Sequence, residues 1–514
     1  MSTSAGAAVS RAGSLTVGEL LGQQARRRPR DVAISDGHKR LDFATLDGRV
    51  DRLANVLTSL GLQRGARIAI LSENRIEYIE TVFAAARLGV IVCCLNWRLA
   101  REELVHCVGL VEPTAMIVSE RFDKTLEAIG WQGPTVRLGS EYEARLAAAN
   151  EVGPAVMAEP EDGLLILYTS GTTGLPKGAL ISHRAELARM TLSRLDFGLA
   201  EGDGFVAWAP MFHMVSLEHS IHVLGLGGQV FVVDGADIDR IVDLVEAERQ
   251  WWLVLIPGMA ERLVQAVKDR GIRPKGLKVA GALADMFPKR LIAETSRLLE
   301  APYWNTFGST ETGMMPAAGT RFAPGCEPRS LAKAHNSLYL WRLVDADGKD
   351  VQRGQPGEIA VRGPTVFSGY WNAAEVNARE FRDGWFHMGD LFVELPDGTL
   401  QYVDRSKYLI KSGGENIYPA EIERVLMADA RVAEAVVVKR RDAKWGEVPV
   451  AFVALQPAAR MTSEELMQLC RARLSTYKCP SEVRLVKSQD QFPRGTSGKV
   501  QRQVVEQWAQ ESVS

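Results

Sequence analysis

Residues 168–178 concentrate groups that can hold a chain of phosphates. They contain four Ser/Thr hydroxyls, three glycines and one lysine, and they directly follow the apolar residues 164–167. Glycines let backbone N–H groups approach an anion closely, while hydroxyls and a lysine add donors at the same place. The pattern predicts a buried strand that leads into a loop cradling a triphosphate. The Gly-x-x-x-x-Gly-Lys-Ser/Thr spacing of a P-loop is absent, and a polar surface loop is the competing interpretation.

Later segments also place charged or hydroxyl side chains in loops. Their members with the clearest chemistry are Thr310, Glu311, Asp390, Arg405 and Lys499. A carboxylate can hold Mg²⁺ or accept from two vicinal hydroxyls, and cations can neutralise phosphate. Taken alone, each segment has a plain structural interpretation, such as a turn, a linker with a surface salt bridge or a solvated lysine.

Together and in this order, the segments resemble the signature motifs of the adenylate-forming superfamily: acyl- and aryl-CoA synthetases, adenylation domains and luciferases. The matching motifs extend from residue 168 to residue 499. The resemblance implies that a carboxylate attacks the α-phosphate of ATP, giving acyl-AMP and pyrophosphate. A thiol then takes the acyl group, giving a thioester and AMP. ATP, Mg²⁺ and CoA as co-substrate are the implied small molecules.

The resemblance assigns most of these residues to the nucleotide. Phe307 would lie against adenine, Thr310 would donate to the α-phosphate, and Glu311 would hold Mg²⁺. Asp390 would bind both ribose hydroxyls, and Arg405 would contact ribose or phosphate. The remaining predicted ATP-binding residues are Thr169, Ser170, Gly171, Thr172, Thr173, Gly174, Lys177, Gly281 and Ala282, with Thr172 as a second metal ligand.

Some positions depart from the family's usual pattern. Phe307 replaces the commoner Tyr, which preserves stacking but not a hydroxyl hydrogen bond. Met388 stands where Thr is usual, and Tyr408 stands where an acidic residue is often found. Leu283 departs from a loop that usually reads Gly-Gly-Ala/Ser-Pro, so the acyl pocket is expected to be reshaped there.

The C-terminal motifs resemble those of the family's C-terminal domain, which takes a different position in each half-reaction. Lys407 matches the hinge about which the C-terminal domain rotates. Lys499 matches the lysine that bridges carboxylate and α-phosphate during adenylation only. Gly413 and Gly414 would line the pantetheine tunnel, and Lys478 could meet the phosphates of CoA. The sequence around Lys499 also looks like a regulatory acetylation site, which implies a lysine acetyltransferase and a deacetylase as partners.

The predicted acyl pocket lies around a histidine that follows two apolar residues. His213 could act as a gate, contact the carboxylate or thioester, or be a packed core imidazole. The pocket residues implied by the resemblance are His213, Met214, Val215, Gly308 and Met314. Methionine gives an apolar, adaptable lining, which favours an aryl, alicyclic or medium-chain acid.

Free CoA is predicted to accept the acyl group, because no carrier-protein domain is recognisable. The alternatives are an adenylating enzyme that loads a carrier protein and a nucleotide-binding sensor that has lost catalysis. Neither the acid, the pathway nor the oligomeric state follows from the sequence.

Strand-like and helix-like segments alternate through most of the chain, which predicts a layered α/β fold. Expected strands include residues 67–71, 90–94, 205–208, 230–233 and 252–257; expected helices include 77–87, 218–223 and 259–269. The expected division is a flexible tail at 1–13, an N-terminal adenylation domain of two α/β subdomains at 14–404 with a β-rich subdomain at about 337–404, a hinge at 405–409, and a small mobile α+β domain at 410–514.

Bulk composition excludes several classes of function. The chain has 514 residues and a formal net charge of −2, so no overall attraction to nucleic acid is expected. No run reaches the roughly 18 apolar residues of a membrane span. The cysteines form no Cys-x-x-Cys pair, so neither zinc nor a disulfide framework is indicated, and a cytoplasmic location is expected.

Overall fold

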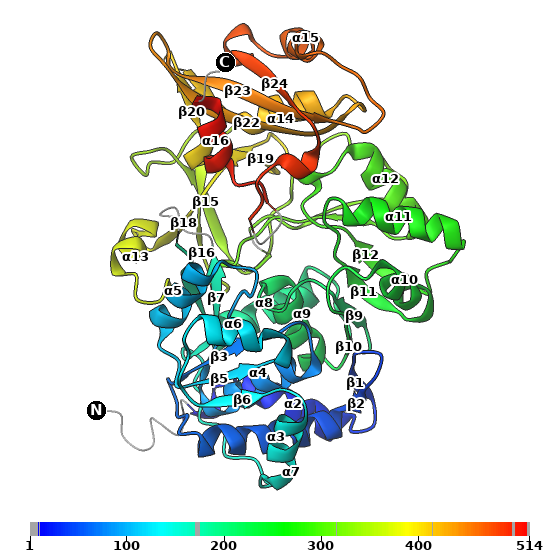
Figure 1. Cartoon of the computed structure of the whole chain (residues 1–514), viewed down its shortest axis with the longest axis vertical. Helices are drawn as coiled ribbons and strands as arrows, with labels where there is room; N and C mark the ends of the chain where they lie inside the picture. The colour runs from blue at the N-terminus through cyan, green and yellow to red at the C-terminus, as the bar shows by residue number, and fades with distance from the viewer. Residues whose placement is uncertain are drawn as a thin grey trace. The chain divides into compact units, whose positions relative to one another are not determined.

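The structure is a computed structural model that describes residues 9, 11–169, 175–314, 316–413, 415–495 and 499–510. The chain divides into two compact units, whose elements are labelled in Figure 1. The first unit comprises residues 1–340 and 362–386, and the second comprises residues 341–361 and 387–514. In the part of the chain that the structure describes, no helix is both long enough and apolar enough to cross a membrane.

A six-stranded sheet in the first unit ends in an antiparallel pair at one edge. Its strand order is β6-β5-β3-β4-β7-β8, and every pair is parallel except β7–β8. The strands are β3 (Arg67–Leu71), β4 (Ile91–Cys94), β5 (Ala115–Val118), β6 (Thr135–Arg137), β7 (Gly163–Thr169) and β8 (Lys177–Ser182). Parallel strands covered on both faces read as continuous apolar runs, as β4 does.

A second sheet of the first unit has eight strands, in the order β14-β13-β12-β11-β9-β10-β1-β2. Its central strands are parallel, and its two edge pairs, β1–β2 and β13–β14, are antiparallel. The strands are β1 (Val32–Ser35), β2 (Arg40–Asp42), β9 (Gly204–Ala207), β10 (Gln229–Val232), β11 (Gln250–Leu253), β12 (Leu277–Ala280), β13 (Tyr303–Asn305) and β14 (Thr320–Phe322).

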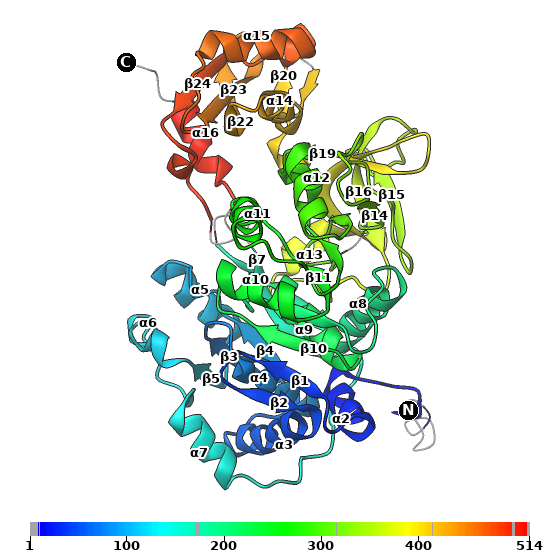
Figure 2. The ribbon, with the colours of Figure 1, turned by 90° about the vertical axis from the view of Figure 1, so that its right-hand side faces the viewer.

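Helices cover these sheets. α4 (Ile76–Leu88) is buried along its whole length and packs against α2 (Val17–Arg27), α3 (Phe43–Ser59) and α9 (Met214–Gly225). α8 (His183–Leu195) lies beside α9, and α10 (Ile238–Ala247) lies beside α11 (Met259–Arg270), as Figure 2 shows. The others are α5 (Arg101–Val111), α6 (Asp123–Ala128), α7 (Ser140–Ala148), α12 (Lys289–Leu298) and α13 (Ala374–Glu380).

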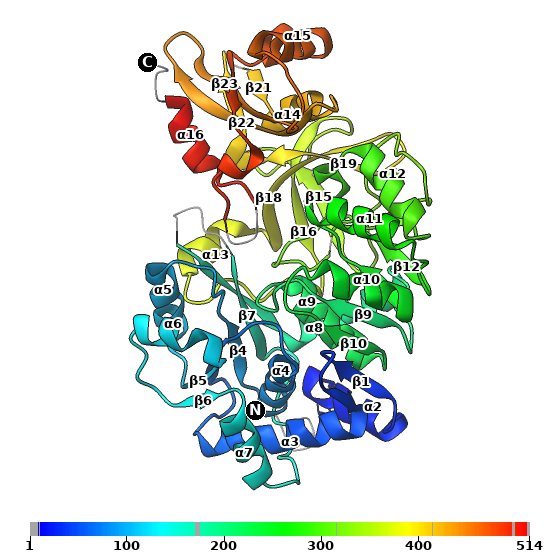
Figure 3. The ribbon, with the colours of Figure 1, turned by 45° about the vertical axis from the view of Figure 1, so that its right-hand side comes forward.

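The second unit contains all or most of the antiparallel strands β15, β16, β18 and β19 and a C-terminal sheet of order β21-β20-β23-β22, with β24 beside β23, whereas β17 belongs to the first unit. α14 and α15 pack on one face of that sheet, and α16 packs on the other (Figure 3). The bounds are β15 (Leu340–Val344), β16 (Pro356–Arg362), β17 (Phe381–Arg382), β18 (Trp385–Glu394), β19 (Leu400–Arg405), β20 (Ile410–Ser412), β21 (Glu415–Ile417), α14 (Pro419–Met427), β22 (Val432–Asp442), β23 (Gly446–Leu455), α15 (Ser463–Arg473), β24 (Glu482–Val486) and α16 (Arg502–Gln510).

The predicted alternation of strands and helices is confirmed. The expected strand at 67–71 is β3, and the expected helix at 259–269 is α11. The expected strand at 252–257 was placed too far along the chain, because β11 runs from Gln250 to Leu253. Its neighbour β12 ends at Ala280, and Gly281 turns away with φ +100°, so no partner strand continues beside residues 254–257.

Candidate functional site

The β7–β8 hairpin holds the two ends of the predicted phosphate loop. Thr169 pairs with Lys177 in the antiparallel register, so the last residue of β7 faces the first residue of β8. The Thr169 hydroxyl is buried and has no hydrogen-bond partner within the described part of the protein. A buried hydroxyl of this kind is expected where a ligand supplies the acceptor. Predicted residues Ser170, Gly171, Thr172, Thr173 and Gly174 lie outside the described residues.

Tyr370 brings the phosphate-loop hairpin and the predicted metal ligand together. Its hydroxyl donates to Glu311 Oε1 at 2.7 Å, and its ring centroid lies 3.8 Å from Lys177 Nζ. The segment around Tyr370 is fixed because its backbone pairs with β8: Trp371 N donates to Gly178 O at 2.8 Å. The sequence pattern around Tyr370 does not predict this role, since residues 366–371 are mainly aromatic or small and carry no charged group.

Glycine is required in the turn that carries Thr310 and Glu311. Ser309 N donates to Gly313 O at 3.0 Å, and Gly313 N donates to Ser309 O at 2.8 Å. A Cβ on Gly308 would lie 2.1 Å from Gly313 O, so no other residue fits there without moving the turn. The turn is held from outside as well, because Phe367 N donates to Glu311 O at 2.8 Å.

The loop after β12 lies against the end of β13, which leads to Phe307. A Cβ on Gly281 would lie 2.5 Å from the Tyr303 ring, and Tyr303 Oη donates to Ala282 O at 3.0 Å. Phe307 is buried. These residues follow the carboxyl ends of neighbouring parallel strands, where ligands bind in open α/β sheets. The structure therefore places Gly281 and Ala282 against Tyr303, in the strand that leads to Phe307, and their role at adenine stays a prediction.

His213 precedes α9, which begins with the predicted pocket residues Met214 and Val215. The His213 ring lies 4.8 Å from that of Phe212. Asn74 fixes the segment before it: Asn74 Oδ1 accepts from Met211 N at 2.8 Å, while Nδ2 lies 3.1 Å from Ala207 O and 2.9 Å from Val233 O. The role of Asn74 does not follow from the sequence, because its partners lie far along the chain.

Asp390 and Arg405 face each other in the second unit. They are paired in the β18–β19 register, and Arg405 Nε donates to Asp390 Oδ1 at 3.0 Å. Asp390 is buried, whereas the Arg405 side chain is 39% exposed. The two residues predicted to contact ribose and phosphate are thus already an ion pair.

The predicted hinge lies between a strand end and a helix start. Asp404 Oδ2 accepts from Ala420 N at 2.8 Å, which ties β19 to the first turn of α14. Burial raises the pKa of Asp404 to about 6. Lys407 Nζ lies 5.0 Å from the Tyr408 ring centroid, and burial lowers the pKa of Lys407. The aromatic residue at position 408 therefore contacts the lysine predicted to be the hinge.

The remaining predicted residues of the second unit lie in separate places. Gly413 has φ +58°, and a Cβ on it would lie 2.7 Å from the Trp445 ring; Gly414 lies outside the described residues. Lys478 Nζ donates to Glu421 at 2.8 Å. Lys499 closes a small hairpin, because Gly495 N donates to Lys499 O at 2.8 Å.

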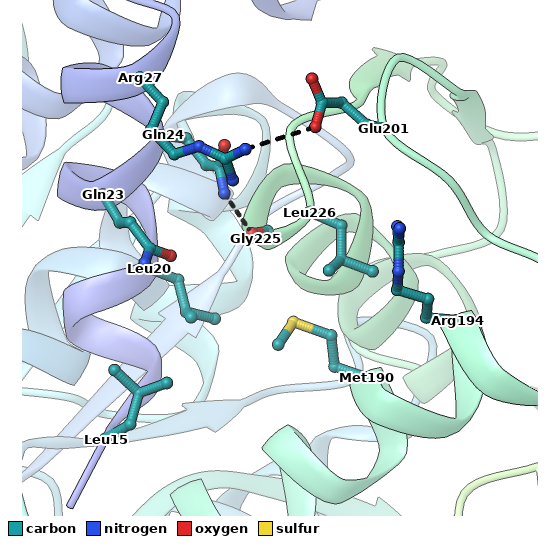
Figure 4. A pocket seen from close by; sticks show the side chains of 10 residues that line it. All are labelled: Leu15, Leu20, Gln23, Gln24, Arg27, Met190, Arg194, Glu201, Gly225 and Leu226. Carbon is teal, nitrogen blue, oxygen red and sulfur yellow. Dashed lines mark hydrogen bonds and ion pairs between the residues drawn. The ribbon is translucent and has the colours of Figure 1, made fainter.

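A surface pocket of about 320 Å³ in the first unit involves none of the predicted site residues (Figure 4). It lies between α2, α8 and the end of α9, where Gln24 Nε2 donates to Gly225 O at 2.8 Å and Arg27 lies 3.6 Å from Glu201. Its lining residues are Leu15, Leu20, Gln23, Gln24, Arg27, Met190, Arg194, Glu201, Gly225 and Leu226.

Two sequence families match the chain. Residues 21–371 match the AMP-binding enzyme family, and residues 421–499 match the AMP-binding enzyme C-terminal domain. The chain belongs to the AMP-binding enzyme family. Its predicted fold, a large N-terminal α/β domain with a small C-terminal domain, is confirmed by these matches.

Members of this family with assigned reactions match the chain over nearly its whole length. An indoleacetate–CoA ligase of Aromatoleum aromaticum is 36% identical, with 96% of this chain and 98% of the relative covered. A 2-succinylbenzoate–CoA ligase of Bacillus cereus is 31% identical, with 96% and 99% covered. The o-succinylbenzoate CoA synthetase structure from Bacillus subtilis, in complex with its acyl-adenylate intermediate, has a TM-score of 0.83 at 27% identity, covering 95% and 97%. This AMP-binding enzyme is an AMP-forming acid–CoA ligase.

Proposed function

We propose that this ligase activates a hydrophobic carboxylic acid, with an aromatic acid as the first candidate. Indoleacetate and 2-succinylbenzoate, the acids in the names of the two relatives above, each carry an aromatic ring. Alicyclic and medium-chain acids are the further candidates, because the adaptable side chains of Met211, Met214 and Met314 would accept them.

The adenylation step is supported by the contact of Tyr370 with both Lys177 and Glu311. In this step a carboxylate oxygen attacks the α-phosphorus of ATP, the bond to pyrophosphate breaks, and acyl-AMP forms. Lys177 and the loop before it would hold the leaving phosphates, and Thr310 would donate to the α-phosphate. Donors fixed in advance stabilise the charge that develops on these oxygens. Phe307 with Gly281 and Ala282 would receive adenine.

The donor set near Glu311 fits a magnesium ion that reaches the site with the nucleotide. Among the residues that the structure describes, no group of three or more His, Cys, Asp or Glu side chains could hold a metal ion. Mg²⁺ is commonly held by one or two carboxylates together with substrate phosphates. Glu311, with Thr172 as the second predicted ligand, would hold it, and it would neutralise phosphate charge there.

The second unit would complete each half-reaction in turn. Asp390 would accept from the ribose hydroxyls, and Arg405 would contact ribose or phosphate. Lys499 would bridge carboxylate and α-phosphate during adenylation. Rotation about Lys407, between a domain at 14–404 and a domain at 410–514, would then bring Gly413 and Gly414 to the pantetheine path. The CoA sulfur attacks the acyl carbon, AMP leaves, and the thiol proton is lost to solvent.

We also propose that Lys499 is regulated by acetylation, on the basis of the resemblance of its surrounding sequence. Acetylation removes the charge of the ammonium group and so its contribution to adenylation. Chemical or enzymatic acetylation at Lys499 should therefore block acyl-AMP formation, and a deacetylase should restore it. Full adenylation activity in a preparation acetylated at Lys499 would contradict this role.

A panel of carboxylates with ATP and CoA tests the proposed substrate class. The panel should include indoleacetate, benzoate-like and cyclohexane-like acids, and linear acids from short to medium length, scored by AMP release. We expect aromatic acids to have the highest kcat/KM. Preference for acetate over every ring-bearing acid would refute the proposed class.

The acceptor is tested in the same reaction. Pre-formed acyl-AMP on the enzyme should be discharged by free CoA, whereas discharge only by a carrier protein would support the carrier-loading alternative. A chain that releases no pyrophosphate with any acid would instead be a nucleotide-binding sensor.

A further inference from the structure

We propose that Arg189, a buried residue of α8, is a positioning residue that holds the Thr310–Glu311 turn in the geometry needed for adenylation. The inference rests on the proposed function, since it concerns the turn to which adenylation is assigned. It adds a buried residue that acts through the backbone on which Thr310 and Glu311 are carried.

Three nitrogens of the Arg189 guanidinium donate in three directions. Nη2 donates to Thr310 O at 3.2 Å, and Nε donates to Thr365 O at 3.0 Å. Nη1 donates to Glu218 Oε1 at 2.6 Å. One planar group therefore joins α8 and α9 to the loop that carries Thr310 and to the loop that carries Thr365. The same two loops are also joined at Glu311, which accepts hydrogen bonds from Phe367 N and from the Tyr370 hydroxyl.

The guanidinium also fills the space under the turn. A Cβ on Gly313 would lie 2.9 Å from Arg189 Cδ, so the turn rests directly on this side chain. Arg189 and Glu218 have side chains only 2% and 1% exposed. A buried arginine–carboxylate pair is costly to desolvate, and burial raises the pKa of Glu218 although the Arg189 charge opposes that shift. Such a pair adds little stability compared with apolar residues of similar size, so a positioning role accounts for it better than stability does.

Lysine cannot reproduce this arrangement. A lysine at position 189 would keep a positive charge opposite Glu218, but its single nitrogen cannot reach Thr310 O, Thr365 O and Glu218 at once. Arg189→Lys therefore separates the positioning role from the need for a buried counter-ion. Arg194→Lys is the matched control, because Arg194 is exposed on the same helix.

Two measurements test the proposal. Hydrogen exchange of peptides covering residues 307–314 and 364–368 needs no catalysis, and it should be about 10-fold faster in Arg189→Lys, with α2 unchanged. Pyrophosphate release with the best acid should fall about 10-fold to 100-fold, and the Mg²⁺ concentration for half-maximal rate should rise. Thioester formation from supplied acyl-AMP should fall much less.

The outcomes distinguish the positioning role of Arg189 from the proposed adenylation function. Wild-type exchange and wild-type Mg²⁺ dependence in folded Arg189→Lys would overturn the positioning role, as would equal effects in Arg194→Lys. A lower rate in proportion to a lower folded fraction, with unchanged Mg²⁺ dependence, would also overturn it in favour of a purely structural role. If wild-type protein forms no acyl-AMP, the proposed function fails, while faster exchange at 307–314 still supports the contact.

Discussion

The hydroxyl of Tyr370 donates to Glu311 Oε1 at 2.7 Å, while the ring of the same side chain lies 3.8 Å from Lys177 Nζ. One aromatic residue thus contacts the cation at the end of the phosphate loop and the carboxylate predicted to hold Mg²⁺. A carboxylate that already accepts a hydrogen bond is held in one orientation. Side chains that bind metals are commonly oriented in this way by a hydrogen-bonding neighbour. Tyr370 therefore links two motifs that lie more than a hundred residues apart in the chain.

Tyr370→Phe should lower the rate of acyl-AMP formation about 10-fold and raise the Mg²⁺ concentration for half-maximal rate. The change keeps the ring beside Lys177 and removes only the donor to a charged acceptor, a bond worth roughly 1.5–3 kcal/mol. Pyrophosphate release measured against Mg²⁺ concentration checks this. Tyr339→Phe is the control, because its hydroxyl donates to Pro316 O instead. The same Mg²⁺ dependence in Tyr370→Phe and wild type would contradict it.

Lys499→Ala should lower acyl-AMP formation at least about 100-fold, the scale of losing one electrostatic stabiliser of the transition state. The same variant should still convert supplied acyl-AMP and CoA to thioester, because Lys499 is assigned to the first half-reaction only. Lys487→Ala, an exposed lysine of the same unit, is the control and should behave as wild type. Equal loss in both half-reactions would refute the assigned role.

Gly414→Leu should impair thioester formation more than adenylation. The resemblance assigns Gly413 and Gly414 to the pantetheine path, which a leucine side chain would narrow. Pyrophosphate release and thioester formation measured on one preparation provide an internal control. Thioester formation at the wild-type rate would count against a path at this loop.

The parts of the site that the sequence predicts best are short and continuous along the chain. The apolar run before the predicted phosphate loop is β7, as its composition predicts. Lys177 begins β8, which pairs with β7, and the composition of the loop does not predict this pairing. The motif Thr462-x-x-Glu465 is a capping box at the start of α15, since Thr462 N donates to Glu465 Oε2 at 2.7 Å and Glu465 N donates back to Thr462 Oγ1 at 3.2 Å. Local hydrogen bonds and hydrophobic period suffice for such features.

The sequence predicts least where a residue's partners are distant. Arg189 lies in a helical pattern in which an arginine is usually solvated. It is buried instead because its guanidinium donates to Glu218 and to two loop carbonyls, all distant in the sequence. Tyr370 is similar, because its role depends on Lys177 and Glu311. The strand expected at 252–257 was misplaced for the same reason: where β11 ends is decided by its neighbour β12, and not by its own apolar residues.

His183, the first residue of α8, anchors the start of α2. Val17 N donates to His183 Nδ1 at 3.2 Å, and His183 is fully buried. Burial lowers the pKa of His183 to about 4, although the nearby Asp162 opposes the shift. The neutral ring accepts the Val17 hydrogen bond, whereas a protonated ring would carry a proton at both nitrogens and lose it.

The free energy of unfolding should therefore fall as the pH drops from 6.5 toward 4. In this window the unfolded chain binds a proton at residue 183 that the folded chain excludes, so the contribution of His183 is fully present above pH 6.5 and lost progressively below it. A shift of this size corresponds to roughly 3 kcal/mol at the acid end.

His183→Asn keeps an acceptor near Nδ1 but does not titrate, so its thermal midpoint should fall less than that of wild type between pH 7 and pH 5. His219 and His222, whose pKa values burial lowers to about 3, are present in both proteins, so their effects on the thermal midpoint cancel in the comparison. Parallel curves for the two proteins would show that residue 183 does not set this dependence.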